Sequence, residues 1–134
     1  MIGPLSILHV DNDAGIRTIF ELALRLDPSI DLISAASGDE ALERLDQEET
    51  CPHIAVLDAM MPGMSGVELL HELHARESTA HLPVLFVTAS DRSTEKRDYL
   101  EAGAIGVISK PFEAVGLAKR IRSHFEDWKR HHAL

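Results

Sequence analysis

The sequence predicts an α/β doubly wound fold, a five-stranded parallel sheet in the order 2-1-3-4-5 with five helices. Short apolar runs alternate with amphipathic patterns of helical spacing along the whole chain. The runs are apolar on both faces, as strands are when helices cover both sides of a parallel sheet. No repeat or Pro/Gly/Ser-rich linker interrupts this alternation. The pattern alone leaves the strand order open, and 2-1-3-4-5 is the common solution for it.

Five apolar runs bounded by turn residues are the predicted strands. They extend from Leu5 to Val10, Ile30 to Ala35, His53 to Leu57, Pro83 to Val87 and Ile105 to Ile108. His9 lies inside the first run, and we expect a core histidine that makes a hydrogen bond.

Amphipathic segments between the runs predict the helices. Apolar residues recur at helical spacing in the first helix at Ile16, Ile19, Phe20, Ala23 and Leu26. The last helix has the same spacing at Ala114, Leu117, Ala118, Ile121, Phe125 and Trp128. Ser37 with Glu40, and Ser65 with Glu68, resemble capping boxes, and Gly103 is a suitable helix stop. Residues 93–101 are polar and weakly periodic, so their helix has the least support.

Length and composition favour one globular domain. The 134 residues suit a single domain, 1–134, with a core of about 5–125 and a C-terminal helix extension or tail at 126–134. The single cysteine, Cys51, excludes an internal disulfide and fits a reducing compartment. No apolar run reaches the length of a membrane span, and the N-terminus has no signal-peptide pattern. These features predict a cytoplasmic protein.

The formal net charge of −9 argues against direct nucleic-acid binding, which needs a basic face. Residues 39–49 are mostly acidic, whereas the last helix is rich in lysine and arginine. Two solvated helix faces of opposite sign are the simplest interpretation, and a partner surface on the basic helix is the alternative.

Polar residues follow the predicted strands at their C-terminal ends, where ligands bind in such sheets. They are Asp11, Asn12 and Asp13 after the first strand, Asp58 after the third, Thr88 at the end of the fourth and Lys110 after the fifth. An ionised aspartate is a ready nucleophile at neutral pH. Attack on a phosphoryl group brings two anions together, and a hard divalent cation such as Mg²⁺ with a lysine would offset their repulsion.

From about residue 5 to 125 the chain resembles the response-regulator receiver domains of two-component phosphorelay signalling. Four motifs in the right order carry this resemblance: Val10-Asp11-Asn12-Asp13; Leu57-Asp58 with Met61-Pro62 and Gly66; Val87-Thr88-Ala89; and Ala102-Gly103-Ala104 with Lys110-Pro111-Phe112. The resemblance implies the flavodoxin-like fold of chemotaxis regulators. It also implies a phosphoprotein that is not a turnover enzyme on a small substrate.

The resemblance implies a role for each matching position. Asp58 is then the phosphoacceptor, which forms an aspartyl phosphate, and also a magnesium ligand together with Asp11, Asn12 and the backbone carbonyl of Met60. Thr88 contacts the phosphoryl oxygen, Lys110 pairs with it, and the Lys110–Pro111 peptide is cis. Met60 and Ser90 tune the gain and loss of the phosphoryl group, and Met60 is bulky enough to shield the site from water. A histidine kinase or a histidine phosphotransfer protein is the implied donor.

Two positions depart from the family pattern. Asn12 stands where the second residue of an acidic pair is usual, so we expect weaker Mg²⁺ binding. Val107 stands where the family usually has Tyr or Phe, the aromatic that swings inward with the Thr88 hydroxyl. We therefore expect a reduced conformational response.

Two other functions stay open from the sequence. A receiver-fold interaction module that does not depend on phosphorylation would explain Asn12 and Val107. A haloacid-dehalogenase-like phosphatase would use Asp11 as nucleophile in an Asp-x-Asp signature, but it lacks support from the motif around Asp58. Trp128 continues the apolar stripe of the last helix and is a candidate homodimer contact.

Overall fold

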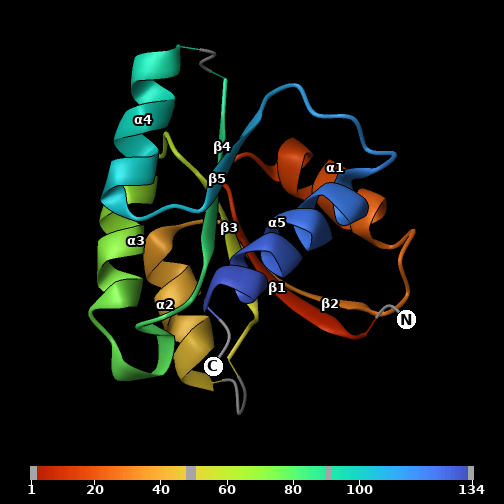
Figure 1. Ribbon diagram of the computed structural model, residues 1–134, viewed down its shortest axis with the longest axis horizontal. Helices are drawn as coiled ribbons and strands as arrows, with labels where there is room; N and C mark the ends of the chain where they lie inside the picture. Colours follow the sequence, from red (N-terminus) through yellow and green to blue (C-terminus); the bar gives the residue numbers. More distant parts are fainter. Residues whose placement is uncertain (1–2, 48–50, 90–91, 133–134) are drawn as a thin grey trace.

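Five parallel strands form one sheet in the order β2-β1-β3-β4-β5, as predicted (Figure 1). The computed structural model describes residues 3–47, 51–89 and 92–132. The strands are β1 (Leu5–Val10), β2 (Ile30–Ala35), β3 (Ile54–Asp58), β4 (Val84–Thr88) and β5 (Gly106–Ser109). The last three each begin and end one residue later than their apolar runs. The backbone ladder therefore continues onto a polar residue, which brings Asp58 and Thr88 into the sheet itself.

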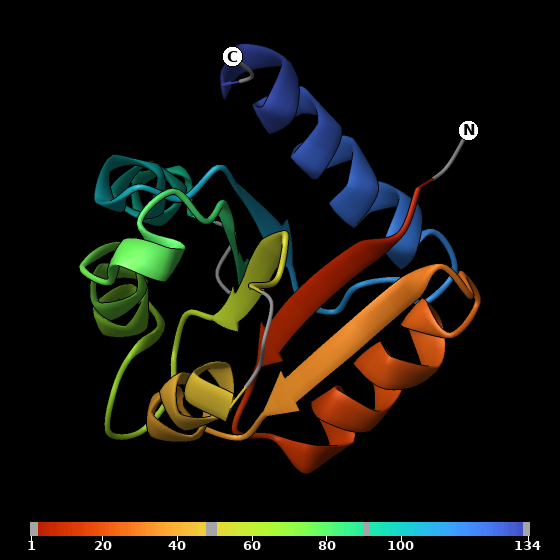
Figure 2. The same ribbon diagram turned by 90° about the horizontal axis from the view of Figure 1, so that it is seen from below.

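Helices cover both faces of the sheet (Figures 1 and 2). One face carries α1 (Ala14–Leu24) and α5 (Leu117–His132). The other carries α2 (Gly38–Gln47), α3 (Gly66–His74) and α4 (Ser93–Ala102), and a short 3-10 turn, η1 (Glu77–Thr79), precedes β4. Within the part of the chain that the structure describes, no helix is long and apolar enough to cross a membrane.

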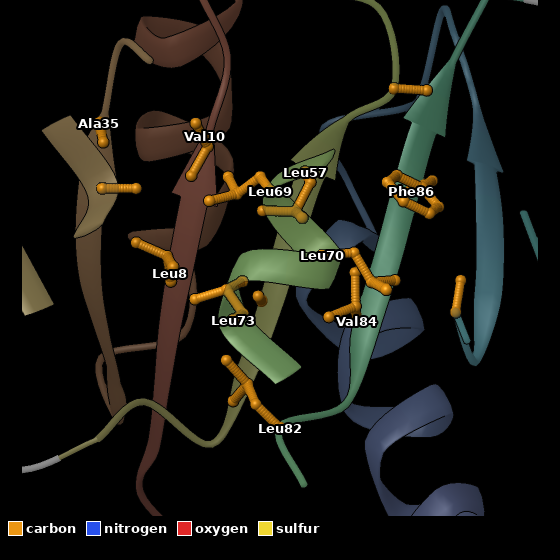
Figure 3. Close-up of a cluster of buried hydrophobic side chains, with 14 of the residues drawn as sticks. Leu8, Val10, Ala35, Leu57, Leu69, Leu70, Leu73, Leu82, Val84 and Phe86 are labelled. Atoms are coloured by element: carbon orange, nitrogen blue, oxygen red, sulfur yellow. The ribbon is translucent and has the colours of Figure 1, made fainter. Parts of the chain in front are cut away.

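Alternate residues of each strand face alternate helix layers, which gives two cores. On the α2–α4 side, Leu69, Leu70 and Leu73 of α3 pack against β1, β3 and β4 (Figure 3). On the α1 and α5 side, Phe20 and Ile121 pack against the opposite faces of the same strands. Burying one such large side chain contributes about 1.5–3 kcal/mol. A slip of one residue would exchange the two faces, so packing fixes the register.

The apolar face of α1 is narrower than its sequence pattern suggests. Phe20, Ala23 and Leu24 are buried, but Ile19 is 47% exposed and Leu26 is 68% exposed. Leu26 lies beyond the end of the helix at Leu24, so helical periodicity no longer sets its direction. Ile19 is turned by about 100° from Phe20, the residue that faces the sheet. Helical spacing alone therefore does not place these two residues in the core.

His9 is a core residue, as expected, but not for the expected reason. Its ring is 1% exposed and stacks on Phe20 with the ring centroids 3.6 Å apart. Its Nδ1 atom has no hydrogen-bond partner, so the predicted hydrogen bond is wrong for that atom. Burial, reinforced by the charges of Lys110 and Arg17, lowers the pKa of His9 to about 3. The ring is therefore neutral at physiological pH and behaves as an aromatic core side chain.

Helix ends follow the capping signals in the sequence. The Asp13 carboxylate accepts from the amides of Gly15 and Ile16 and begins α1. Ser65 and Glu68 form the predicted capping box of α3, and Gly103 ends α4 with φ of 120°. At the other predicted box, the Ser37 hydroxyl accepts from the Glu40 amide.

The weakly predicted helix forms as α4, although none of its residues is buried. Tyr99 is the α4 side chain that packs against the core, with its ring centroid 4.9 Å from that of Phe86.

The last helix is longer than the core needs, and its final turns extend away from the sheet (Figure 2). Trp128 continues the apolar stripe there, half-buried, and stacks between Phe125 and His132.

Candidate phosphoacceptor site

Two aspartates meet at the edge where the strand order reverses. β1 pairs in parallel with both β2 and β3, and Val10 lies opposite Leu57 in the ladder. The residues that follow, Asp11 and Asp58, therefore leave neighbouring strands at the same edge. The chain turns to opposite faces of the sheet after these two strands, which opens a crevice that backbone does not fill.

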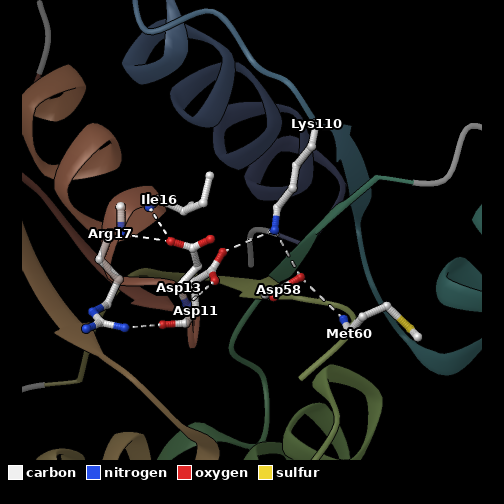
Figure 4. Close-up of polar contacts among 8 residues, drawn as sticks. Asp11, Asp13, Ile16, Arg17, Asp58, Met60 and Lys110 are labelled. Carbon is white, nitrogen blue, oxygen red and sulfur yellow. Dashed lines mark hydrogen bonds and ion pairs between the residues drawn. The ribbon is translucent and has the colours of Figure 1, made fainter. Parts of the chain in front are cut away.

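Lys110 joins the two carboxylates. Its ammonium Nζ lies 3.3 Å from Asp11 Oδ2 and 3.4 Å from Asp58 Oδ1, and Figure 4 shows the side chain extending between them. Asp11 is fully buried and Asp58 is 5% exposed. Lys110 follows β5, and its peptide bond to Pro111 is cis, as the resemblance implied. Two buried carboxylates thus share one cation.

Backbone amides complete the shell around the carboxylates. The Met60 amide donates to Asp58 Oδ1 at 3.3 Å, and the Asp13 amide donates to Asp11 Oδ1 at 2.9 Å. Burial raises the pKa of Asp58 above its ordinary value, and the neighbouring Asp11 carboxylate raises it further. Lys110 and the Met60 amide oppose this shift. The ionised form of Asp58 is therefore disfavoured in this site, and additional positive charge nearby would stabilise it.

Gly66, the first residue of α3, lets that helix approach the Asp58 strand end. A Cβ atom there would lie 2.4 Å from the Asp58 carbonyl oxygen and 3.0 Å from the Phe86 ring. The first distance is with backbone, which cannot swing away as a side chain can. The match to Gly66 in the sequence motif therefore has a steric cause.

The other predicted residues lie around this centre. Thr88 is buried at the end of β4, and its carbonyl accepts the Lys110 amide at 2.8 Å. Asn12 is exposed beside Asp11. Val107 is half-buried on β5, opposite Phe86 in the ladder. Ser90 lies outside the described residues.

The Met60 side chain does not shield the site. It is 75% exposed, and its sulfur end points away from Asp58 in Figure 4. The bulk of the residue suggested a shield from sequence, but its backbone amide bonds Asp58 and the side chain is directed to solvent.

The donor set suits a hard divalent cation. Asp11 Oδ2 is buried without a hydrogen-bond partner among the residues that the structure describes, and the Lys110 ammonium lies at ion-pair distance from it. Carboxylate and amide oxygens are the ligands that Mg²⁺ takes, and it keeps several waters when few protein ligands are available. Among the described residues, no three His, Cys, Asp or Glu side chains gather in a way that could hold a metal ion. The carboxylates at this edge that share the Lys110 ammonium are those of Asp11 and Asp58, and Asn12 is the exposed residue beside them.

Two features were missed by sequence reasoning. Arg17 Nη1 donates to the Asp11 backbone carbonyl at 2.8 Å (Figure 4). An arginine on the first turns of a helix has no sequence signal that separates this contact from a solvated one. The second feature is an apolar hollow of about 300 Å³ beside the site, lined by Ile16, Ile19, Ala89, Lys110, Pro111 and Phe112. In the sequence, the only sign of this hollow was the apolar residue Ile19, but its helical spacing is also what a core residue would show.

A doubly wound domain with two aspartates and a lysine where the strand order reverses is typical of phosphoryl-accepting signalling domains. Consistently, the family model of the response regulator receiver domain matches residues 7–122. This chain therefore belongs to the response regulator receiver domain family, whose general function is phosphorylation on an aspartate.

Individual relatives agree with this family. The probable transcriptional regulator ycf27 of Porphyridium aerugineum is 40% identical over 117 residues, which are 87% of this chain and 46% of that protein. The chemotaxis protein CheY of Pseudomonas aeruginosa is 35% identical over 122 residues, 91% of this chain and 97% of that protein. The structure of chemotaxis regulator CheY4 of Vibrio cholerae superimposes with a TM-score of 0.80 at 26% identity, covering 90% of this chain and 98% of that one. The chain spans about half the length of several relatives that it matches, ycf27 among them.

Proposed function

We propose that Asp58 accepts a phosphoryl group from a phosphohistidine donor and that the resulting aspartyl phosphate alters protein interactions. The observation that carries this proposal is the Lys110 ammonium, placed within 3.4 Å of both the Asp58 and Asp11 carboxylates. The Asp58 carboxylate is then the nucleophile, and Asp11 and Lys110 set the charge around it. In the transfer, an Asp58 carboxylate oxygen forms the new O–P bond while the N–P bond to the donor imidazole breaks. The imidazole nitrogen keeps the electron pair.

Charge is the main obstacle to this transfer, because the attacking oxygen and the phosphoryl oxygens are both negative. Lys110 already lies at the reacting carboxylate and would pair with a phosphoryl oxygen after a small movement. Thr88 ends the strand next to β3 and would supply a hydroxyl donor to the same group. Both would stabilise negative charge where it develops in the transition state, and enzymes gain much of their rate enhancement in this way.

Receiver domains generally bind Mg²⁺. We propose that Asp11, Asp58, Asn12 and the Met60 carbonyl hold the ion in this chain. When bound, it supplies positive charge to the phosphoryl oxygens. Because Asn12 brings an oxygen without a charge, the site binds the ion more weakly than a site with three carboxylates would.

The two alternative functions have less support. A phosphatase that used Asp11 as nucleophile would need the Asp13 carboxylate for proton transfer, but that carboxylate caps α1 through two amides. An interaction module independent of phosphorylation would explain Asn12 and Val107. It would not need the buried Asp11 and Asp58 carboxylates beside the half-buried Lys110, because buried charges are costly to keep in a fold.

Labelling with acetyl phosphate and Mg²⁺ tests the proposal. The acyl phosphate is trapped with borohydride and mapped by mass spectrometry, with Asp58→Asn as the control. We expect label on Asp58 in the wild type and none at that position in the variant. Label on Asp11 would instead indicate the phosphatase, and a folded protein without label would indicate the interaction module.

The Asn12→Asp substitution tests the proposed cation ligands. Two unit charges about 4 Å apart interact by about 1 kcal/mol even in bulk water, and Mg²⁺ carries two charges, so its affinity should rise at least about fivefold. Isothermal titration calorimetry at fixed ionic strength measures it. Gln47→Glu, at the exposed end of α2, adds the same negative charge outside the proposed site and controls for the change in net charge. An unchanged Mg²⁺ affinity in Asn12→Asp would rule out Asn12 as a ligand position.

Receiver domains interact with histidine kinases. We propose that the donor of this chain docks over the apolar hollow beside Lys110. A protein that brings its phosphohistidine to Asp58 must contact the rim of the site, and Ile19 stands on that rim half-exposed. An apolar rim beside a polar centre is typical of interaction sites.

The Ile19→Glu substitution tests this docking surface. It should lower the rate of phosphotransfer from a phosphorylated histidine donor protein by about tenfold or more, the cost of removing an interface anchor. Labelling by acetyl phosphate, which needs no docking, should stay unchanged. Leu26→Glu is the matched control, because Leu26 is an exposed leucine beyond the far end of the same helix. Equal loss in both variants, or loss of acetyl phosphate labelling, would contradict the docking surface.

A further inference from the structure

The Asp11–Asn12 peptide is held from the helix that follows it. Arg17, on the first turns of α1, donates from Nη1 to the Asp11 carbonyl oxygen at 2.8 Å. This oxygen belongs to the peptide bond between Asp11 and Asn12. Because a peptide group is planar, fixing its oxygen also fixes the direction in which the chain enters Asn12. One guanidinium contact thus constrains two residues that we assign to the cation site.

The contact has little freedom to vary. Arg17 is half-buried, and its own amide donates to the Asp13 carbonyl at 3.0 Å. Asp13 in turn donates its amide to Asp11 Oδ1. Asp13 therefore holds the Asp11 side chain, and Arg17 holds the Asp11 backbone carbonyl. We find no hydrogen bond from the Asn12 side chain to any residue that the structure describes, so its placement depends on this backbone.

We propose that Arg17 is a positioning residue for the cation site: it orients the Asp11–Asn12 peptide so that both side chains present their oxygens to the ion. This inference rests on the proposed function, because it assigns Asp11 and Asn12 to that site. Arg17 acts through the Asp11 carbonyl and contacts neither the ion nor the phosphoryl group.

A charge effect and a positioning effect of Arg17 predict opposite changes in metal affinity when Arg17 is removed, which makes the inference testable. Arg17 is a cation near a cation site. If its charge were its whole effect, removing it would tighten metal binding. If it positions the peptide, removing it weakens binding, because the ligands must then be ordered at the moment the ion binds.

The test compares Arg17→Met and Arg17→Lys with the wild type, using Mn²⁺ alone as the probe and counting free Mn²⁺ by electron paramagnetic resonance. Mn²⁺ takes the same oxygen ligands as Mg²⁺. We expect Arg17→Met to weaken Mn²⁺ binding by about fivefold or more, the loss of one charge-assisted hydrogen bond. Arg17→Lys keeps the charge but has one donor centre in place of the planar fork, so it should restore affinity only in part. Arg25→Met is the control, because the Arg25 side chain is exposed just after α1 and pairs with Glu21.

A second readout needs no metal. In metal-free buffer, hydrogen exchange at the Asp13 amide, followed by nuclear magnetic resonance, should speed up in Arg17→Met and not in Arg25→Met. Affinity equal to or tighter than wild type in Arg17→Met, with unchanged exchange at Asp13, would overturn the inference. If the wild type itself bound no Mn²⁺ and took no label at Asp58, the proposed function would fail instead, so the two failures are distinguishable.

Discussion

The structure depends on one electrostatic constraint: Asp11 and Asp58 place two like charges side by side in a buried site, and Lys110 is the cation that both contact. Buried like charges raise the free energy of the folded state unless positive charge offsets them. The rest of the domain must supply enough stability to tolerate this arrangement, and the two apolar cores do so. Its benefit is chemical, since a site short of positive charge favours a divalent cation. Under the proposed function, the same shortage makes the orientation of each proposed ligand important.

The fold sets this geometry through backbone rather than through the three side chains. The reversal of strand order brings the ends of β1 and β3 together, and Gly66 allows α3 to begin against the Asp58 carbonyl. Asp13 and Arg17 hold the turn that follows β1 from two sides. Position is thus determined by rigid elements, and the reactive groups lie where those elements end.

Much of this could be predicted from sequence, for identifiable reasons. Parallel strands buried on both faces leave continuous apolar runs, so all five strands were located, and the capping signals at Ser37 and Ser65 act locally. The positions of Asp58 and Lys110 followed from the motifs. The direction of individual side chains could not be predicted, because it depends on tertiary neighbours. Ile19 has helical spacing but faces outward, Met60 faces solvent, and His9 is buried with an unpaired Nδ1. In the sequence, Arg17 has no feature that separates it from a surface arginine, because its contact depends on how the turn before it folds.

The most direct measurement of this electrostatic constraint is the stability of Asp58→Asn against the wild type in urea, without metal and with saturating Mg²⁺. Asparagine keeps an acceptor for the Met60 amide but removes one of the two buried charges. We expect a higher urea midpoint for Asp58→Asn in metal-free buffer, with an unchanged slope. We also expect Mg²⁺ to stabilise the wild type more than the variant, because the ion binds the folded site with both carboxylates. A variant less stable than the wild type without metal would contradict the claim that unbalanced negative charge governs this site.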